Sequence, residues 1–147
     1  MLTKVLARAE VLCAERGVRL TAQRRRVLEL VCRAGRPVGA YEILDQIRDG
    51  ATAAPPTVYR ALDFLLRQGL VHKLETLHAY VGCTHPEHAH VSQFLICADC
   101  GDVTELENES IAGSVRSVAA ETGFEPHRPI VEVIGTCSNC TLKPTDQ

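Results

Sequence analysis

The stretch HKLETLHAYVGCTHPEHAHVSQFLICADCGDVTE, residues 72–105, contains five of the six histidines and three of the seven cysteines of this 147-residue chain. The charge changes sign within it: residues 1–82 contain 13 Lys and Arg against 8 Asp and Glu, whereas residues 83–147 contain 3 against 10. Imidazole and thiolate groups are the ligands that zinc prefers, and a basic half is typical of a nucleic-acid-binding surface. The stretch therefore predicts a metal site at the junction between a nucleic-acid reader and a second, acidic unit.

Composition sets the broad class of protein. The residues are 46% hydrophobic but only 4% aromatic, so the core must be built mainly from aliphatic side chains. Two halves of about 80 and 65 residues would each have a marginal core, which a metal ion or a dimer would help to stabilise. The sequence opens with no charged-then-apolar leader and contains no long apolar run, so neither export nor membrane insertion is indicated. Two Cys-x-x-Cys pairs and an odd number of cysteines fit a reducing compartment, and we expect a cytoplasmic protein.

The basic half combines four helical segments with two short alternating segments. Apolar periodicity predicts helices over residues 2–16, 21–34, 40–49 and 56–68. Residues 70–74 and 79–82 then alternate, which predicts a β-hairpin. This order is typical of a winged helix-turn-helix, in which the last helix enters the major groove and the hairpin lies along the DNA backbone.

The acidic half has a different pattern. We expect strands over residues 93–96, 103–106 and 130–134, a helix over 110–122 and a disordered tail over 141–147. A small sheet of this kind has open edges, which favour a dimer across the sheet. The predicted fold class is α+β: a winged helix-turn-helix domain over 1–82, a hinge over 83–92, and a small α/β dimerisation and metal-binding domain over 93–147.

Two pairs of cysteines, Cys97 with Cys100 and Cys137 with Cys140, are separated by 36 residues. Four thiolates can close a tetrahedral site, which is the coordination that structural zinc prefers. Free thiols or a redox pair are the competing interpretation.

Cys83 and the remaining ligand-type side chains of the opening stretch predict a second site, although the residues alone do not choose its four ligands. The soft sulfur of Cys83 favours zinc over manganese or magnesium and argues less decisively against iron. The other candidates are nearby acids and five histidines: His72, His78, His85, His88 and His90.

One catalytic interpretation competes with these sites. His85-Pro86-Glu87 followed by Cys97-x-x-Cys100 superficially matches a zinc-deaminase signature. Only nine residues separate Glu87 from Cys97, too few for the helix and strand that a deaminase places there. We therefore expect that the protein is not an enzyme.

Residues 19–26 (RLTAQRRR), residues 56–62 (PTVYRAL) and the two Cys-x-x-Cys pairs together resemble the ferric uptake regulator family. Residues 55–73 are most similar to its zinc-responsive branch, and the resemblance extends over about residues 5–142. It implies a homodimeric repressor that binds palindromic operator DNA when a regulatory site holds zinc, and that controls zinc-uptake genes. The alternative is an iron- or peroxide-responsive regulator of the same family.

The resemblance also implies site residues. It assigns a structural zinc to Cys97, Cys100, Cys137 and Cys140. It assigns a regulatory zinc to His72, Cys83, His90 and Glu105, with His88 as a substitute for His90, so that each subunit would hold two zinc ions. A third metal site has little support, and a contact between two dimers on one operator stays open. Tyr41 and Arg60 match positions that face bases, and we further expect Thr57, Tyr59 and Arg24 at the DNA.

Overall fold

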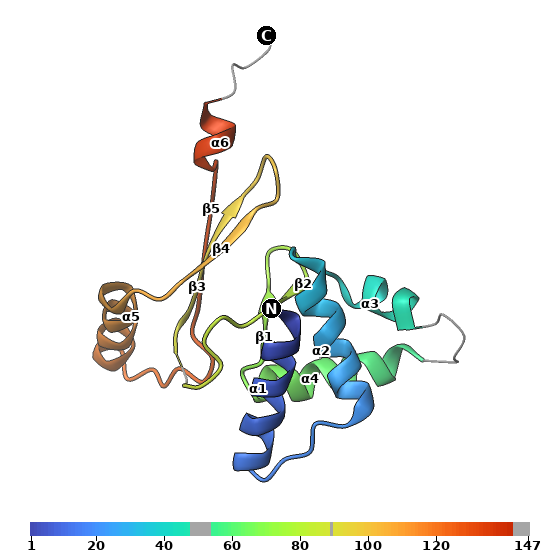
Figure 1. Ribbon diagram of the computed structural model, residues 1–147. Helices are drawn as coiled ribbons and strands as arrows, with labels where there is room; N and C mark the ends of the chain where they lie inside the picture. The colour runs from blue at the N-terminus through green and yellow to red at the C-terminus, as the bar shows by residue number, and fades with distance from the viewer. Residues whose placement is uncertain (48–53, 89, 143–147) are drawn as a thin grey trace. The chain divides into compact units, whose positions relative to one another are not determined.

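The computed structural model describes residues 1–47, 54–88 and 90–142, and its internal contacts separate two units, Met1–Ala89 and His90–Gln147 (Figure 1). The boundary between the units falls inside the segment predicted as a hinge. No helix in the described ranges is both long and apolar enough to cross a membrane.

The N-terminal unit begins with three helices, α1 (Leu2–Glu15), α2 (Ala22–Ala34) and α3 (Ala40–Ile47). The Thr21 side chain accepts a hydrogen bond from the backbone N–H of Arg24 at 3.3 Å, which caps α2 as predicted. Gly35 ends α2 in the left-handed conformation at φ 63°, which glycine adopts without steric cost. The bounds of α1 and α2 confirm the first two predicted helices. The end predicted for the third helix, at residue 49, lies outside the described residues.

Helix α4 (Pro55–Arg67) and a hairpin of β1 (Val71–Leu74) and β2 (Ala79–Gly82) complete this unit. Proline occupies the first two positions of α4, where its missing N–H would have no helical partner anyway. The strands pair antiparallel from Val71 opposite Gly82 to Leu74 opposite Ala79. The four-helix and hairpin order of a winged helix-turn-helix is therefore confirmed.

The core of the N-terminal unit lies among all four helices and the hairpin. Its fully buried members include Val27, Leu28, Ile43, Leu62 and Leu65. On α4, Leu66 was expected to be buried but is only half-buried, whereas Phe64, for which no burial was predicted, is 5% exposed. The Arg24 guanidinium of α2 lies over the Phe64 ring and covers it.

The C-terminal unit is a three-stranded sheet with one long helix. Its elements are β3 (Ser92–Cys97), β4 (Val103–Leu106), α5 (Glu109–Glu121), β5 (Ile130–Gly135) and α6 (Ser138–Thr141). The strand order is β4-β3-β5; β4 runs antiparallel to β3, while β5 runs parallel to it. A parallel neighbour requires a crossover, and α5 lies in that connection.

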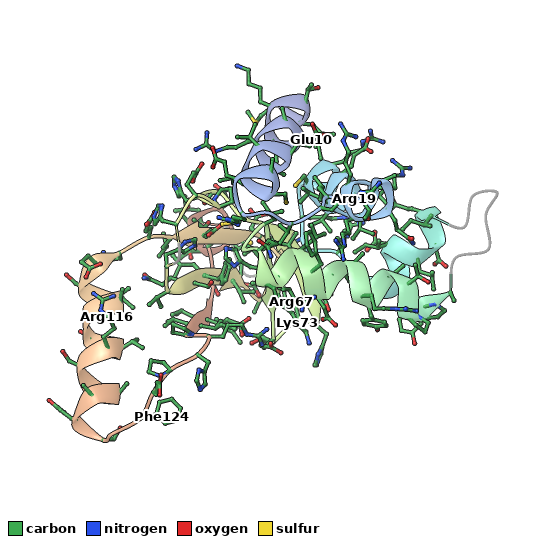
Figure 2. The ribbon with its side chains drawn as sticks, turned by 90° about the horizontal axis from the view of Figure 1, so that it is seen from below. Glu10, Arg19, Arg67, Lys73, Arg116 and Phe124 are labelled. Atoms are coloured by element: carbon green, nitrogen blue, oxygen red, sulfur yellow. The ribbon has the colours of Figure 1, made fainter. Side chains whose placement is uncertain are left out.

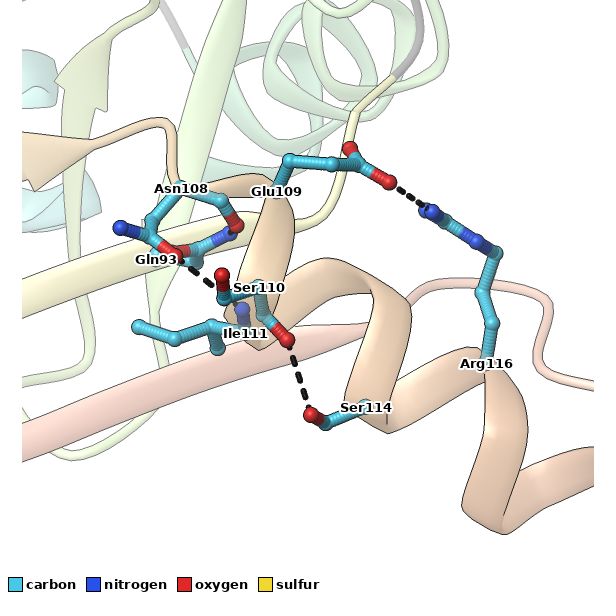
Figure 3. A network of polar contacts seen from close by, with 7 residues as sticks. All are labelled: Gln93, Asn108, Glu109, Ser110, Ile111, Ser114 and Arg116. Atoms are coloured by element: carbon cyan, nitrogen blue, oxygen red, sulfur yellow. Dashed lines mark hydrogen bonds and ion pairs between the residues drawn. The ribbon is translucent and has the colours of Figure 1, made fainter.

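The start of α5 is tied to the central strand (Figure 3). The Asn108 side chain accepts a hydrogen bond from the Ile111 N–H at 3.1 Å, and the Asn108 carbonyl accepts one from Gln93 Nε2 at 3.0 Å. Gln93 is 2% exposed, so one buried amide of β3 fixes the cap residue of the helix. An ion pair between Glu109 and Arg116 and a hydrogen bond from Ser114 to the Ser110 carbonyl follow along the first turns.

The expected disordered tail was wrong at its first residue. Thr141 is the last residue of α6, and its N–H donates to the carbonyl of Cys137 at 2.9 Å. The short helix arises because the final Cys-x-x-Cys folds as one helical turn that begins after Cys137. Residues 143–147 lie outside the described residues.

Gly82, at the end of β2, leaves no room for a side chain. A Cβ atom at this position would lie 2.9 Å from Cys32 Sγ. We predict that Gly82→Ala lowers the free energy of unfolding by about 1–3 kcal/mol, because one methyl group must be forced against a packed sulfur. Thermal unfolding of Gly82→Ala, Cys32→Ala and the double variant would measure this contact.

Gly39→Ala is the matched control, since its Cβ would meet only the His78 carbonyl at 4.0 Å. We expect Gly39→Ala to be neutral or slightly stabilising. The double variant of Gly82→Ala and Cys32→Ala should lose less free energy of unfolding than the sum of the two single variants. Equal melting temperatures for Gly82→Ala and Gly39→Ala would contradict the steric argument.

Candidate metal centre and nucleic-acid interface

The two Cys-x-x-Cys pairs meet at one end of the C-terminal sheet. Because β3 and β5 are parallel, both strands end at the same edge; one cysteine pair begins with the last residue of β3, and the other begins two residues after the end of β5. Cys97 is aligned with Gly135, and the N–H of Ala98 donates to the Gly135 carbonyl at 2.9 Å. As a result, the four sulfur atoms of Cys97, Cys100, Cys137 and Cys140 all lie within 4.8 Å of one another.

Local backbone geometry aims these sulfurs at a common point. After β3 the chain turns back through Gly101, whose φ of 80° requires glycine and whose N–H donates to the Cys97 carbonyl at 3.0 Å. Cys137 and Cys140 are one helical turn apart, with the Cys140 N–H donating to the Cys137 carbonyl at 3.1 Å. Gly101 was not singled out from the sequence, although a glycine directly after a Cys-x-x-Cys pair is the signal that could have found it.

Electrostatics within the cluster favour a cation. The Cys137 backbone N–H donates to Cys97 Sγ at 3.3 Å. This hydrogen bond has the largest effect among several that together lower the pKa of Cys97 to about 6. Hydrogen bonding with the Cys137 side chain raises the pKa of Cys140 to about 12. One sulfur therefore already favours the thiolate, while another would need a nearby positive charge to lose its proton.

The geometry of the cluster fits zinc. Cys100 Sγ and Cys137 Sγ are 3.7 Å apart, and a tetrahedron with zinc–sulfur bonds of about 2.3 Å has edges of about 3.8 Å. Four cysteines leave no position for water or substrate, which is the arrangement of a structural site.

The other predicted ligands form one pair in each unit. In the N-terminal unit, His72 of β1 lies opposite Val81, and the N–H of Cys83 donates to the Leu70 carbonyl at 3.0 Å. This bond continues the ladder by one residue, so His72 and Cys83 project from the same face of the hairpin.

In the C-terminal unit, His90 Nε2 lies 3.2 Å from Glu105 Oε1 on β4. This geometry favours His90 over His88 as the partner of Glu105. His88 belongs to the N-terminal unit, with its ring centroid 6.3 Å from that of His85. His78 lies in the hairpin turn, with a positive φ of 48°. That one ion joins the two pairs stays a prediction.

The residues predicted to contact DNA differ in availability. Tyr41 is 69% exposed and Tyr59 41% exposed, while Arg60 is exposed on α4 with its Nε directed at the Pro56 carbonyl at 3.4 Å. Thr57 is half-buried on the same helix. Tyr59 and Arg60 therefore lie on the exposed side of α4, and Tyr41 is exposed on α3.

Arg24 has a structural task that sequence reasoning missed. Its guanidinium lies 3.8 Å from the centre of the Phe64 ring and donates to the Arg19 carbonyl at 2.6 Å. The guanidinium that we expect at the DNA is therefore already engaged within the N-terminal unit, where it links α2 to α4.

A winged helix-turn-helix unit joined to a sheet unit with a four-cysteine cluster defines a metal-binding protein with a DNA-binding fold. The profile of the ferric uptake regulator family matches residues 15–134, and the chain belongs to this family. It is 43% identical over 139 residues to the zinc uptake regulation protein of Escherichia coli K12, covering 93% of this chain and 81% of that protein.

Solved structures agree with this assignment. A zinc uptake regulator complexed with zinc and DNA has a TM-score of 0.90 and 42% identity, covering 96% of this chain and 95% of that one. The holo form of XcZur has a TM-score of 0.89 at 45% identity, covering 97% and 100% of the two chains. Its apo form has a TM-score of only 0.56 at the same identity, covering 95% and 97%.

We predict that Cys100→Ser releases the metal of the four-cysteine cluster and lowers the melting temperature by on the order of 10 °C, since binding to such a site contributes directly to folding. Metal content by elemental analysis and thermal unfolding would check this. Cys32→Ala, which changes a cysteine outside the cluster, should retain the metal. Unchanged metal content in Cys100→Ser would contradict a four-cysteine site.

Proposed function

We propose that this protein is a zinc-responsive transcriptional repressor that binds palindromic operator DNA as a homodimer and controls zinc-uptake genes. The observation that carries the proposal is the similarity, across both units, to a zinc uptake regulator that was solved with zinc and DNA. The ligand types agree with it, because a cysteine at the junction of the units favours zinc over harder cations.

Each subunit would hold two zinc ions. The structural ion would be held by Cys97, Cys100, Cys137 and Cys140, whose sulfur spacing fits a closed tetrahedral site. The regulatory ion would be held by one pair of ligands from each unit, His72 with Cys83 and His90 with Glu105.

A ligand set divided between two units explains how the metal would act. An ion that binds all four groups would fix the DNA-reading unit relative to the rest of its subunit, whereas without the ion the two units would be free to adopt many arrangements. Two-fold operators require the spacing of the two reading units to match the half-sites. Zinc would then populate the competent geometry, with a coupling of about 1–3 kcal/mol, or roughly 5-fold to 150-fold in DNA affinity. The holo and apo forms of XcZur support such a change. Both are 45% identical to this chain, but the TM-score is 0.89 for the holo form and 0.56 for the apo form.

The C-terminal sheet supports the homodimer. β5 is an outer strand of the sheet, and its Val133 and Ile134 are 52% and 55% exposed. Val118 on α5 and Phe124 just after it are also exposed, and Figure 2 shows Phe124 at the end of that helix. An open edge with apolar neighbours is the surface that a second copy can cover.

In the reading unit, α4 would enter the major groove. Arg60 is long enough to donate two hydrogen bonds to O6 and N7 of a guanine, and Tyr41 at the start of α3 would contact a neighbouring base. Thr57 and Tyr59 would add contacts from α4. The hairpin would lie along the DNA backbone.

Two other functions are less well supported. An iron- or peroxide-responsive regulator of the same family would use the same fold, but the soft sulfur of Cys83 favours zinc and argues, less decisively, against iron. A zinc enzyme needs an open coordination position beside a general base, and four protein ligands at each proposed site would leave none.

We predict that buffered trace zinc switches on binding to a palindromic operator, that ferrous iron does so much less well, and that Cys83→Ser abolishes the zinc response. The measurement is a DNA-binding titration by fluorescence anisotropy, with protein that carries only its tightly held metal. Cys32→Ala serves as the cysteine control and should respond like the unaltered protein. An equal response to iron, or a normal response of Cys83→Ser, would place the protein among the iron-responsive regulators.

We predict that Arg60→Ala reduces discrimination between operator and random DNA by about 1–3 kcal/mol, because a base contact is lost. Arg24→Ala should instead weaken binding to both kinds of DNA and reduce the salt dependence, if its guanidinium also contacts a phosphate. Affinities measured at several salt concentrations would separate the two effects. Thermal unfolding of Arg24→Ala would show how much of its loss comes from the Phe64 contact. Equal losses on operator and random DNA for Arg60→Ala would defeat its role as a base-reading residue.

A further inference from the structure

Two arginines of the N-terminal unit hold the segment that follows the hairpin. We call residues 84–88, which directly follow Cys83, the linker. Arg16, directly after α1, donates from Nη2 to the carbonyl of Pro86 in the linker at 2.9 Å. Arg8 of α1 forms an ion pair with Glu87, the next residue of the linker. The linker is therefore attached to the start of the chain at two consecutive residues.

The Arg16 guanidinium makes a second contact that joins the linker to α4. Its Nη1 donates to the carbonyl of Gln68 at 2.6 Å, and Gln68 is the C-cap residue of α4. A cation at the C-terminal end of a helix interacts favourably with the carbonyls exposed there. One planar, forked side chain thus bridges the end of the proposed DNA-reading helix and a linker residue three positions after Cys83.

The hydrogen bond from the Cys83 N–H to the Leu70 carbonyl lies close to this bridge along the chain. Gly69, with φ 67°, and Leu70 connect the end of α4 to β1. The end of the helix is consequently connected to the chain around Cys83 twice, once through the Leu70 carbonyl and once through Arg16.

We infer that Arg16 is a positioning residue for the regulatory metal site. By holding the linker in place before any ion binds, it reduces the number of residues that must be ordered when zinc joins Cys83 to His90. Since ordering a flexible segment costs conformational entropy, a prearranged linker raises the affinity for zinc. The inference rests on the proposed function, because it assumes that zinc binding at this site controls DNA binding.

The test compares the zinc concentration that gives half-maximal operator binding in several variants. Arg16→Ala should raise this concentration about threefold to tenfold, which is the effect expected from losing hydrogen bonds of a charged donor at a partly exposed site. Operator affinity at saturating zinc and the metal content of the four-cysteine cluster should stay close to those of the unaltered protein. A purely structural role would instead lower thermal stability and operator affinity without moving the zinc midpoint.

Matched variants sharpen the comparison. Arg16→Lys keeps the charge but cannot reach both carbonyls with a planar fork, so its midpoint should lie between those of Arg16→Ala and the unaltered protein. Arg25→Ala removes a surface ion pair with Glu10, 2.7 Å long, that does not involve the linker, and it should leave the midpoint unchanged. Glu87→Gln removes the negative charge that pairs with Arg8 and so weakens that contact, and it should shift the midpoint in the same direction as Arg16→Ala, which keeps the test decisive if Arg16→Ala folds poorly.

The outcomes separate the inference from the function on which it rests. If the unaltered protein does not respond to zinc, the proposed function fails and the inference fails with it. If it responds, but Arg16→Ala and Glu87→Gln share its midpoint, the positioning role is overturned while the function stands. The positioning role is also overturned if Arg25→Ala shifts the midpoint as far as Arg16→Ala.

Discussion

The parallel pairing of β3 with β5 is the constraint on which the C-terminal unit depends. Because these strands run in the same direction, both Cys-x-x-Cys turns lie at one edge, and the alignment of Cys97 with Gly135 sets how closely they approach. The crossover that such a pairing requires contains α5, and the Asn108 cap with its Gln93 contact fixes where that helix starts. A unit of this size has a small core, so a metal ion at the edge would supply stability that burial alone does not.

The N-terminal unit depends on burial instead. Its four helices enclose fully buried aliphatic side chains such as Leu28 and Leu62, and the hairpin is joined to them through mutual hydrogen bonds between Val38 and Tyr80, 3.0 and 2.8 Å long. Arg24 of α2 stacks on Phe64 of α4 and so connects the two helices. This difference suits the proposed division of labour, since the reading unit would keep its shape whether or not the regulatory ion is bound.

Most elements could be predicted because their signals are local. Thr21 and Gly35 mark the limits of α2, apolar periodicity gives the helices, and the two cysteine pairs indicate a shared site from their ligand type alone. Features that depend on distant residues could not be found in this way. The parallel direction of β5 follows from the crossover as a whole, and the Phe64 ring is covered by an arginine from another helix. Helix α6 is too short to show any periodicity, which is why Thr141 was assigned to the tail. The Arg16 contacts join three separate parts of the chain, so no local pattern signals them.

The contact between Gly82 and Cys32 also bears on how the cysteines of this chain, seven in all, come to differ in reactivity. The sulfur of Cys32 lies against Gly82, the residue just before a proposed zinc ligand. Burial raises the pKa of Cys32 to about 11, so at neutral pH this thiol holds its proton and is a poor ligand and a poor nucleophile. The sulfur beside the proposed sensor is thereby held as the protonated thiol, the form that binds metals and reacts with oxidants less readily than the thiolate.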